Sequence, residues 1–424
     1  MTLTNPGADL DAARTALADA CGEVTDATPA DAVDGVPAAL VARPGSTEEA
    51  GAVLRAAAAQ GLTVVPRGRG TKLGWGRPPE SADVVLDLSR MSRVLDHAAG
   101  DLIVETQAGA LLADVQQTVG TAGQRLALDE PVPGGTVGGM LATNASGPGR
   151  VAVGTARDLL IGVTVVRADG VVAKAGGRVV KNVAGYDLGK LVIGSFGTLV
   201  VVTEAVFRLH PVPAARRFVT VPFGTAEDAS RLVQSVVHAQ VVPAAVEVEW
   251  RVDGAGTVGV LLEGTPAGVE ARTVTTRRLL GAGVEAVESA PPGWGVLPWT
   301  DESGSTGLKL TCALSGLAPV LTALRRAAAD VGVALTVRGS GGAGVVYAAL
   351  GADAPVDAVA DVVTRTRAVC TEHGGSLVVL DGSAAVKAGV DTWGPVPAID
   401  LMRRVKDQFD PERRLAPGRF VGGI

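Results

Sequence analysis

Two glycine-rich stretches contain the residue types best suited to bind a flat, charged ligand. Residues 66–77 (PRGRGTKLGWGR) combine four glycines with four cations, and residues 126–149 contain two Gly-Gly pairs followed by Thr143 and Asn144. Glycine lets backbone N–H groups come close to a ligand, and cations balance the charge of a pyrophosphate. Taken alone, each stretch also fits a flexible loop or a solvated basic turn. Together they favour a dinucleotide site.

The segments around these stretches predict the frame that positions them. The first stretch follows a short buried strand at 62–66, and that strand follows a helix at 46–60 that opens on a Ser46/Glu49 capping box. The run at 137–141 can begin a helix, whose unpaired N–H groups would hold negative charge. The other elements expected in this part of the chain are a helix at 10–21, strands at 39–41, 84–88 and 102–106, a helix at 111–119, a hairpin over 159–173, a short helix ending at 193 and a strand at 199–209.

A repeated pattern of strands and helices follows Pro211 and Pro213. Residues 218–280 and 308–380 each run strand, helix, two strands, helix, and the second set adds a final strand. This order predicts two ferredoxin-like halves that share one antiparallel sheet covered by helices. A linker rich in Pro and Gly, at 291–307, joins the halves, and an amphipathic helix at 398–408 follows them. We therefore predict an α+β fold.

Composition limits the class of function. The chain has 424 residues, a net charge of −6 and a pI near 5.4, which argues against nucleic acid as its main partner. Cys21, Cys312 and Cys370 are far apart and form no CxxC pair, so we expect free thiols in a reducing compartment and no iron–sulfur centre. Acidic residues near the start argue against a secretory signal, and no apolar run is long enough to span a membrane.

Three segments resemble the FAD-binding (PCMH-type) domains of the vanillyl-alcohol oxidase superfamily. They are residues 66–79, residues 131–150 (PVPGGTVGGMLATNASGPGR) and residues 179–211, which contain Lys-Asn-Val-Ala-Gly-Tyr-Asp. The sequences of these segments are most similar to those of the small FAD-binding subunits of bacterial glycolate oxidase. The Phe-Asp-Pro and Pro-Gly-Arg motifs near residues 409–419 extend the resemblance. The resemblance implies four parts: an N-terminal extension at 1–36, an FAD-binding domain at 37–213, a cap at 214–380 and a C-terminal segment at 381–424 that returns to the FAD domain.

The resemblance also implies which residues hold FAD. The first loop would wrap the pyrophosphate, the second would line flavin and pyrophosphate, and a third segment would edge the adenine end. Lys181, Asn182 and Tyr186 belong to a family loop near the cofactor, with a packed Tyr and a solvated Lys as the structural alternative. The cofactor-binding residues expected are Arg67, Gly68, Arg69, Gly70, Thr71, Lys72, Pro133, Gly134, Gly135, Thr136, Val137, Gly138, Gly139, Ala142, Thr143, Asn144, Gly147, Gly197, Thr198, Val201 and Val202.

Several positions depart from the family pattern. Thr71 stands where a His would indicate covalent flavin attachment, so FAD is expected to be non-covalent. Ala416 stands where the family tends to have Asn, which removes a polar flavin contact. The four histidines form no HxH or HxxxH pair, so no metal site is expected. His373 is the one histidine that could act as a base, but a helix-end role is the commoner one; no catalytic residue is assigned.

The resemblance implies an FAD-dependent oxidoreductase acting on small 2-hydroxy acids of the glycolate or D-lactate class. The cap offers the scattered arginines Arg251 and Arg338 but no histidine–acid cluster, so we expect activity only in a hetero-oligomer with a paralogous FAD subunit and an iron–sulfur subunit. We expect a cytoplasmic protein that meets the membrane only through these partners. The alternatives are a stand-alone D-2-hydroxy-acid dehydrogenase and a scaffold subunit that has lost catalysis. No GxGxxG dinucleotide motif or GxSxG hydrolase motif supports a different enzyme class.

Overall fold

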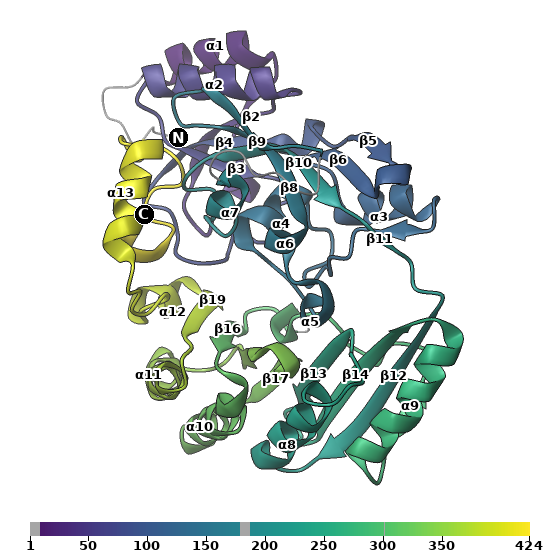
Figure 1. The fold of residues 1–424 in the computed structure, drawn as a ribbon. Coiled ribbons are helices and arrows are strands. Elements are labelled where there is room, and N and C mark those ends of the chain that lie inside the picture. The colour runs from purple at the N-terminus through teal and green to yellow at the C-terminus, as the bar shows by residue number, and fades with distance from the viewer. Residues whose placement is uncertain (1–8, 179–186, 301) are drawn as a thin grey trace.

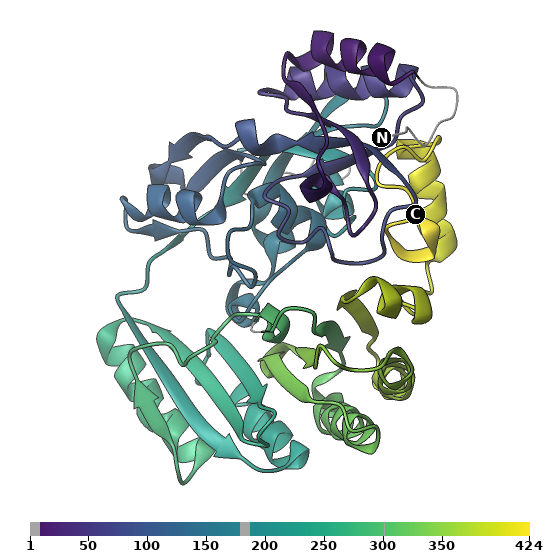
Figure 2. The same cartoon turned by 180° about the vertical axis from the view of Figure 1, so that it is seen from behind.

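The computed structural model describes residues 9–178, 187–300 and 302–424, which form two lobes (Figures 1 and 2). The first lobe contains two sheets with a shared apolar core, and the second is one long sheet covered by helices on its outer side. Lys181, Asn182 and Tyr186 lie outside the described residues. The α+β class predicted from the sequence is confirmed.

A four-stranded sheet carries the loop that begins at Pro66. Its strand order is β1-β2-β4-β3, with β2 and β3 both parallel to β4, so that Arg67 at the end of β3 lies beside Asp87 at the end of β4. The predicted capping residues do start the next helix, but Glu49 accepts from the Gly45 N–H (2.7 Å), one residue before Ser46. The elements are α1 (Leu10–Cys21), β1 (Val24–Asp26), β2 (Ala38–Ala42), α2 (Thr47–Ala59), β3 (Val64–Arg67) and β4 (Ala82–Asp87).

The second sheet of this lobe is antiparallel, with the order β5-β6-β10-β8-β9. Short helices pack on it, and the two-stranded pair of β7 and β11 extends it toward the cap. The strand predicted at 199–209 begins only at Val201. The elements are β5 (Val94–Ala98), β6 (Ile103–Gln107), α3 (Leu112–Gly120), β7 (Gln124–Arg125), α4 (Val137–Thr143), α5 (Arg150–Val153), α6 (Ala156–Leu159), β8 (Leu160–Val166), β9 (Val172–Gly176), α7 (Leu188–Val192), β10 (Val201–Arg208) and β11 (His210–Pro211).

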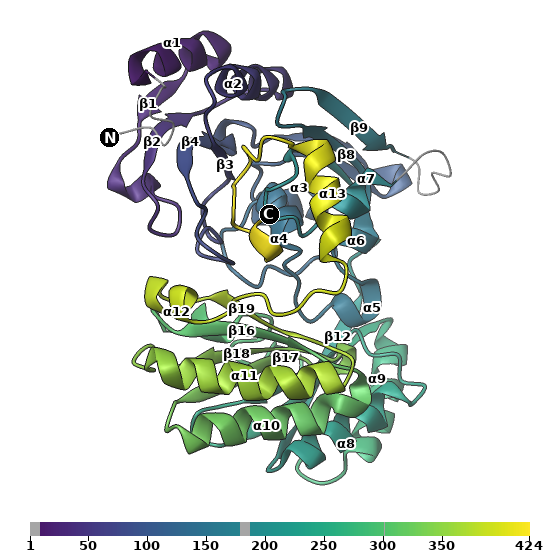
Figure 3. The same ribbon diagram turned by 90° about the vertical axis from the view of Figure 1, so that its left-hand side faces the viewer.

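The cap contains the predicted duplication. Its eight strands are all antiparallel in the order β15-β12-β14-β13-β17-β18-β16-β19, so each half is a βαββαβ unit and the halves join where β13 pairs with β17. The four helices cover one face, which leaves the other toward the first lobe (Figure 3). The elements are β12 (Ala215–Phe223), α8 (Ala226–Val237), β13 (Ala245–Trp250), β14 (Gly256–Gly264), α9 (Pro266–Leu280), β15 (Glu285–Val287), β16 (Thr306–Thr311), α10 (Leu317–Asp330), β17 (Leu335–Ser340), β18 (Val345–Leu350), α11 (Val356–Glu372) and β19 (Leu377–Asp381).

After the cap, the chain crosses back to the first lobe. The helices α12 (Ala384–Gly389) and α13 (Ile399–Phe409) precede a segment in which Leu415 bridges to Val64 of β3. Figure 3 shows α13 and the C-terminus lying against the first lobe. The amphipathic helix predicted at 398–408 is therefore packed against the lobe that begins the chain.

Candidate functional site

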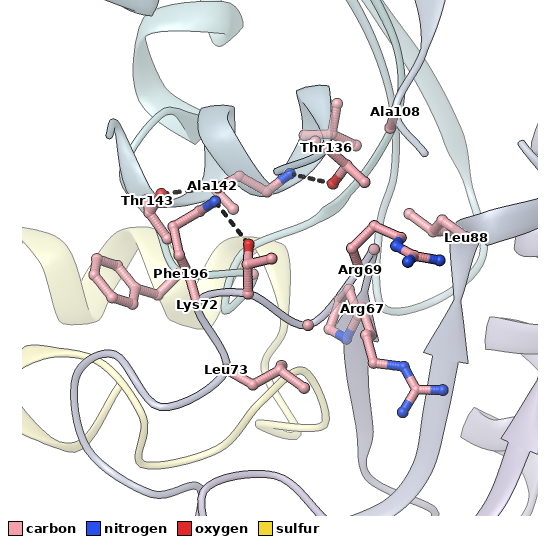
Figure 4. A pocket seen from close by; sticks show the side chains of 18 of the residues that line it. Arg67, Arg69, Lys72, Leu73, Leu88, Ala108, Thr136, Ala142, Thr143 and Phe196 are labelled. Atoms are coloured by element: carbon pink, nitrogen blue, oxygen red, sulfur yellow. Dashed lines mark hydrogen bonds between the residues drawn. The ribbon is translucent and has the colours of Figure 1, made fainter. Parts of the chain in front are cut away.

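The two glycine-rich stretches meet across one pocket in the first lobe (Figure 4). The pocket has about 770 Å³ of space between atoms, counting the part open to solvent. It receives the loop after β3, the helix α4 and the segment before β10. The predicted site residues that line it are Arg67, Gly68, Arg69, Gly70, Thr71, Lys72, Thr136, Gly138, Gly139, Ala142, Thr143, Gly197 and Val202.

The loop after β3 presents open backbone donors to this pocket. Within the described part of the chain, the N–H groups of residues 69–72 donate to no other protein atom. Gly70 has φ +77°, a conformation that glycine adopts without strain. Successive free N–H groups in a turn form a concavity that binds anions such as phosphate. This loop therefore fits the pyrophosphate role expected of it.

The two arginines of the loop have different environments. Arg67 donates to Asp31 and to Asp87, each at 2.8 Å, so its guanidinium is committed within the protein. Arg69 is exposed and makes no hydrogen bond or ion pair with any described residue. Figure 4 shows both side chains extending away from Lys72. Of the two, only Arg69 is free to pair with a ligand.

Lys72 is a buried cation between the two stretches. Its Nζ donates to Thr71 Oγ1 (3.2 Å), and a Cβ at Gly135 would lie only 3.1 Å from it. Burial lowers the pKa of Lys72 to about 8, while the charge of Glu130 acts in the opposite direction. Gly135 thus leaves room for the Lys72 ammonium rather than directly for a ligand.

The N–H groups at the beginning of α4 already have acceptors within the protein, whereas the sequence predicts that they are unpaired. Thr136 caps the helix by accepting from the Gly139 N–H (3.2 Å). The N–H of Gly135 donates to Glu130 (2.8 Å), and those of Val137 and Gly138 donate to carbonyls of the Ala110 and Ala108 turn. Because these donors are already used, the open N–H groups of the pocket come mainly from residues 69–72.

Two glycines allow the walls of the pocket to touch. A Cβ at Gly68 would lie 2.2 Å from Thr136 Oγ1, and a Cβ at Gly138 would lie 2.9 Å from the Ala108 Cβ. Neither glycine has a positive φ, so close approach alone requires them. The spacing of the two stretches therefore depends on missing side chains on both sides.

Some predicted residues lie beside the pocket rather than in its lining. Asn144 ends α4 with φ +48°, and its buried Oδ1 has no partner among the described residues. Gly147 lies at a second cavity, between the two lobes. The predicted residues outside the lining of the first pocket are Pro133, Gly134, Gly135, Val137, Asn144, Gly147, Thr198 and Val201.

Sequence reasoning missed Arg419, which reaches this pocket from the C-terminal segment. It is buried, and its guanidinium donates to the carbonyls of Lys72 (3.0 Å), Leu73 (2.7 Å) and Trp75 (3.3 Å). Burial lowers its pKa to about 10. The Pro-Gly-Arg string was the available signal, but nothing local pointed to its target. The other lining residues that were missed are Pro66, Leu73, Leu88, Ala108, Ser195 and Phe196.

The two cap arginines named from the sequence, Arg338 and Arg251, differ in environment. Arg338 lies at the second cavity and donates to Glu249 (2.9 Å), close to the buried Glu247 and Tyr347. Arg251, in contrast, is exposed.

His373 caps the end of α11, and the described residues include no cluster of His, Cys, Asp or Glu arranged to hold a metal ion. No helix in the described ranges is long and apolar enough to cross a membrane.

The chemistry of the pocket lining fits FAD. It combines the open N–H groups of the β3 loop and Arg69, which pairs with none of the described residues, with apolar lining side chains such as Val200 and Val202. A dinucleotide needs these two kinds of surface, one for its pyrophosphate and one for its flat rings.

Comparison with known proteins agrees with this fit. Residues 38–176 match the FAD binding domain family, and residues 310–420 match the C-terminal domain of FAD linked oxidases. Glycolate oxidase subunit GlcD of Bacillus subtilis is 33% identical over 223 residues, which cover 52% of this chain and 47% of that protein. D-lactate dehydrogenase of Archaeoglobus fulgidus is 35% identical over 211 residues, 49% of this chain and 46% of that one. The chain spans about half the length of these curated relatives.

Solved structures extend the likeness to the whole fold. A 4-ethylphenol oxidase from Gulosibacter chungangensis superposes with a TM-score of 0.74 at 16% identity, covering 99% of this chain and 98% of that one. A xylooligosaccharide oxidase from Myceliophthora thermophila gives a TM-score of 0.69 at 18% identity, covering 95% and 97%. At these identities the likeness concerns the fold alone. Both lobes, including the cap, are therefore arranged as in these two oxidases.

Proposed function

Because the chain belongs to the FAD-linked oxidoreductases, we propose that it takes part in the FAD-dependent oxidation of a small 2-hydroxy acid such as glycolate or D-lactate. The observation that carries this proposal is the pocket between the β3 loop and α4, with its open N–H groups at residues 69–72. The relatives include a glycolate oxidase subunit, a D-lactate dehydrogenase and a D-2-hydroxyglutarate dehydrogenase, which agree on that substrate class.

The residues of the chain would divide the work of holding the cofactor. Residues 69–72 would bind the pyrophosphate through their N–H groups, with Arg69 adding charge at the exposed edge. Arg67 and Arg419 would hold the loop in shape, since both are committed to protein acceptors. Bound FAD would accept the hydride lost by the carbon that carries the substrate hydroxyl. We propose the full set of cofactor residues given above, and the division at residues 36, 213 and 380, on this basis.

We further propose that the chain acts inside a hetero-oligomer with a paralogous FAD subunit and an iron–sulfur subunit. Its three cysteines are free, and two of them are buried, so they are poorly placed to hold a cluster for onward electron transfer. Electrons would then leave through a neighbouring subunit. The alternative of a stand-alone dehydrogenase is favoured by the charged cavity between the lobes.

The test uses the flavin itself as the indicator. The purified chain should be yellow with about one FAD per chain, and acid precipitation should release that FAD into the supernatant, as expected of a non-covalent cofactor. Anaerobic glycolate or D-lactate should then bleach the flavin slowly in the chain alone and rapidly after the partner subunits are added. A colourless chain that FAD does not restore would overturn the proposal, and rapid bleaching without partners would favour the stand-alone enzyme.

A further inference from the structure

The glycine-rich loop after β3 has two halves with different bonding. The N–H groups of residues 69–72 line the pocket and donate to none of the described residues. The carbonyls of residues 72–75 are instead all occupied: three of them accept from Arg419, and that of Gly74 accepts from Lys387 Nζ. Two buried cations from the C-terminal part of the chain therefore hold the second half of the loop.

Lys387 joins three separate parts of the chain. It lies in α12, shortly after the last strand of the cap, and its side chain is only 1% exposed. Its Nζ also donates to Asp34 Oδ2 (2.7 Å), in the N-terminal segment. Burial of an ammonium group costs free energy unless acceptors replace water, and here the acceptors are one carboxylate and one loop carbonyl. Figure 3 shows α12 on the side of the cap that faces the first lobe.

The turn that contains Asp34 fixes the position of its carboxylate. Asp34 and Gly35 both have positive φ (+52° and +83°), as in a type I′ turn. Val33 and Val36 close the turn with two backbone hydrogen bonds of 2.8 and 3.0 Å, and Val33 is completely buried. Because the carboxylate is held on a closed turn, it holds the Lys387 ammonium, and through it the Gly74 carbonyl, at a defined place.

Further contacts connect the same half of the loop to the cap. The N–H of Gly76 donates to the carbonyl of Leu380 in β19 (2.7 Å). The ring of Trp75 packs edge-on against that of Trp299, with 6.1 Å between the ring centroids. The residues with open N–H groups are thus directly continuous with residues whose position depends on the cap, so a displacement of one half would displace the other.

We propose that Lys387 is a positioning residue for the cofactor. By holding the Gly74 carbonyl, it sets the position of the open N–H groups at residues 69–72, so that FAD affinity depends on the docking of the cap. This inference rests on the proposed function for the identity of the ligand. Because coupling between two sites is reciprocal, bound FAD should stabilise the docked position of α12 by the same factor by which docked α12 raises FAD affinity.

The test combines fluorescence titration of the apo-protein with FAD and hydrogen exchange of backbone amides, followed by mass spectrometry. Lys387→Met should raise the Kd for FAD about tenfold, a usual size for coupling between sites, and should speed exchange in peptides that cover residues 72–77. Lys387→Arg keeps a charged donor and should retain most of the affinity. Lys174→Met, which changes an exposed lysine on β9, should leave both quantities unchanged. In the wild type, FAD should slow exchange in α12, and Lys387→Met should abolish that slowing.

A second control separates positioning from a loss of stability. Val236→Ala opens a cavity in the core of the cap, on α8, without touching the loop. It should lower the Tm but leave the Kd for FAD of the folded protein unchanged. If Lys387→Met does not fold, Asp34→Asn provides the test, because it removes the charged acceptor of Lys387 and should also raise the Kd.

The outcomes distinguish this inference from the proposed function. Wild-type FAD affinity in Lys387→Met, or in Asp34→Asn where that variant provides the test, would overturn the positioning role and leave the proposed function intact. Weakened FAD binding in these variants, without reduction of the wild-type flavin by glycolate or D-lactate even when the partner subunits are present, would support the positioning role and overturn the function.

Discussion

At the scale of single residues, the cofactor pocket depends on the absence of a side chain at Gly68. A Cβ at this position would overlap Thr136 Oγ1 at 2.2 Å, although the backbone of Gly68 is ordinary. The β3 loop and the cap of α4 can approach only because one side chain is absent. This contact is between residues far apart in the chain, so the sequence could mark the glycine but not its reason.

Gly68→Ala should therefore push the loop away from α4, lower the free energy of unfolding by about 1–3 kcal/mol and abolish FAD retention. Urea unfolding and the ratio of flavin to protein absorbance would measure the two effects. Gly120→Ala is the matched control, because a Cβ there meets no atom within 4 Å. Stoichiometric FAD in Gly68→Ala would contradict this account of the pocket.

Substitution of Arg67 should mainly lower stability, whereas substitution of Arg69 should mainly weaken FAD binding. Arg67→Gln leaves Asp31 and Asp87 without their shared cation and should cost roughly 2–4 kcal/mol of stability. Arg69→Gln should leave stability unchanged within about 0.5 kcal/mol and raise the Kd for FAD about three- to tenfold, with a weaker dependence on salt. Thermal unfolding of the apo-protein and fluorescence titration with FAD measure each quantity. Equal effects of the two variants on FAD affinity would refute the division of roles.

At the scale of elements, α13 is attached to the cofactor lobe by one buried lysine. Lys406 Nζ donates to the Thr198 carbonyl (2.6 Å) and to Asp410 Oδ2 (2.6 Å), and Asp410 also accepts from the N–H groups of Arg414 and Leu415. The Phe-Asp-Pro string noted in the sequence is thus a structural junction. Because Thr198 follows Gly197 in the pocket wall, the helix supports the site from behind.

Lys406→Met should leave Asp410 buried and uncompensated, which costs about 3–5 kcal/mol of unfolding free energy. FAD affinity should fall as well, because the wall at residues 197–198 loses its support. Arg404→Gln changes an exposed residue of the same helix and should shift stability by no more than about 0.5 kcal/mol. Denaturant unfolding of both variants is the measurement, and similar midpoints would show that α13 is not held in this way.

Strand β13 contributes a group that makes stability depend on pH. The pKa of Glu247 is about 8 in the fold and 4.5 in its ordinary environment. Between these values the unfolded chain releases its proton while the folded chain keeps it, so stability falls as pH rises through this window. Glu247→Gln has no proton to release, and its stability relative to wild type should rise by on the order of 2 kcal/mol from pH 5.5 to pH 8.5.

Urea unfolding at those two pH values measures this effect for Glu247→Gln and for Glu372→Gln, an exposed control on α11. Glu372→Gln should follow the wild-type pH profile. Parallel profiles for Glu247→Gln and the wild type would mean that Glu247 is ionised in the folded protein.

At the scale of the whole molecule, the sequence predicted the architecture better than it predicted the contacts between its parts. The cap duplication could be inferred because the apolar patterns of strands and helices are local. The structure forms the predicted strands and helices between β12 and β19. The return of Arg419 to the loop at Lys72 could not be inferred, and neither could the contact of Tyr347 in the cap with the Ser146 carbonyl. Both depend on how separate lobes dock, and single-sequence patterns contain no signal for that.

FAD should stabilise the whole molecule by mass action, because its pocket needs both the first lobe and the C-terminal segment. At an FAD concentration one hundred times the Kd, the gain is about 2.7 kcal/mol. Thermal unfolding of the apo-protein across an FAD titration should show a single transition that moves upward. A second transition whose temperature does not change with FAD concentration would show that the cap unfolds independently of the pocket.

The long reach of Arg419 has a consequence for how the protein is made. Its hydrogen bond to the Lys72 carbonyl joins positions 347 residues apart. During synthesis the glycine-rich loop emerges from the ribosome early, but the side chain that fixes its shape emerges only after the entire cap has been translated. The cofactor pocket can therefore be completed only after residue 419 has left the ribosome, and a chain interrupted earlier would hold its FAD loop without the residue that orders it.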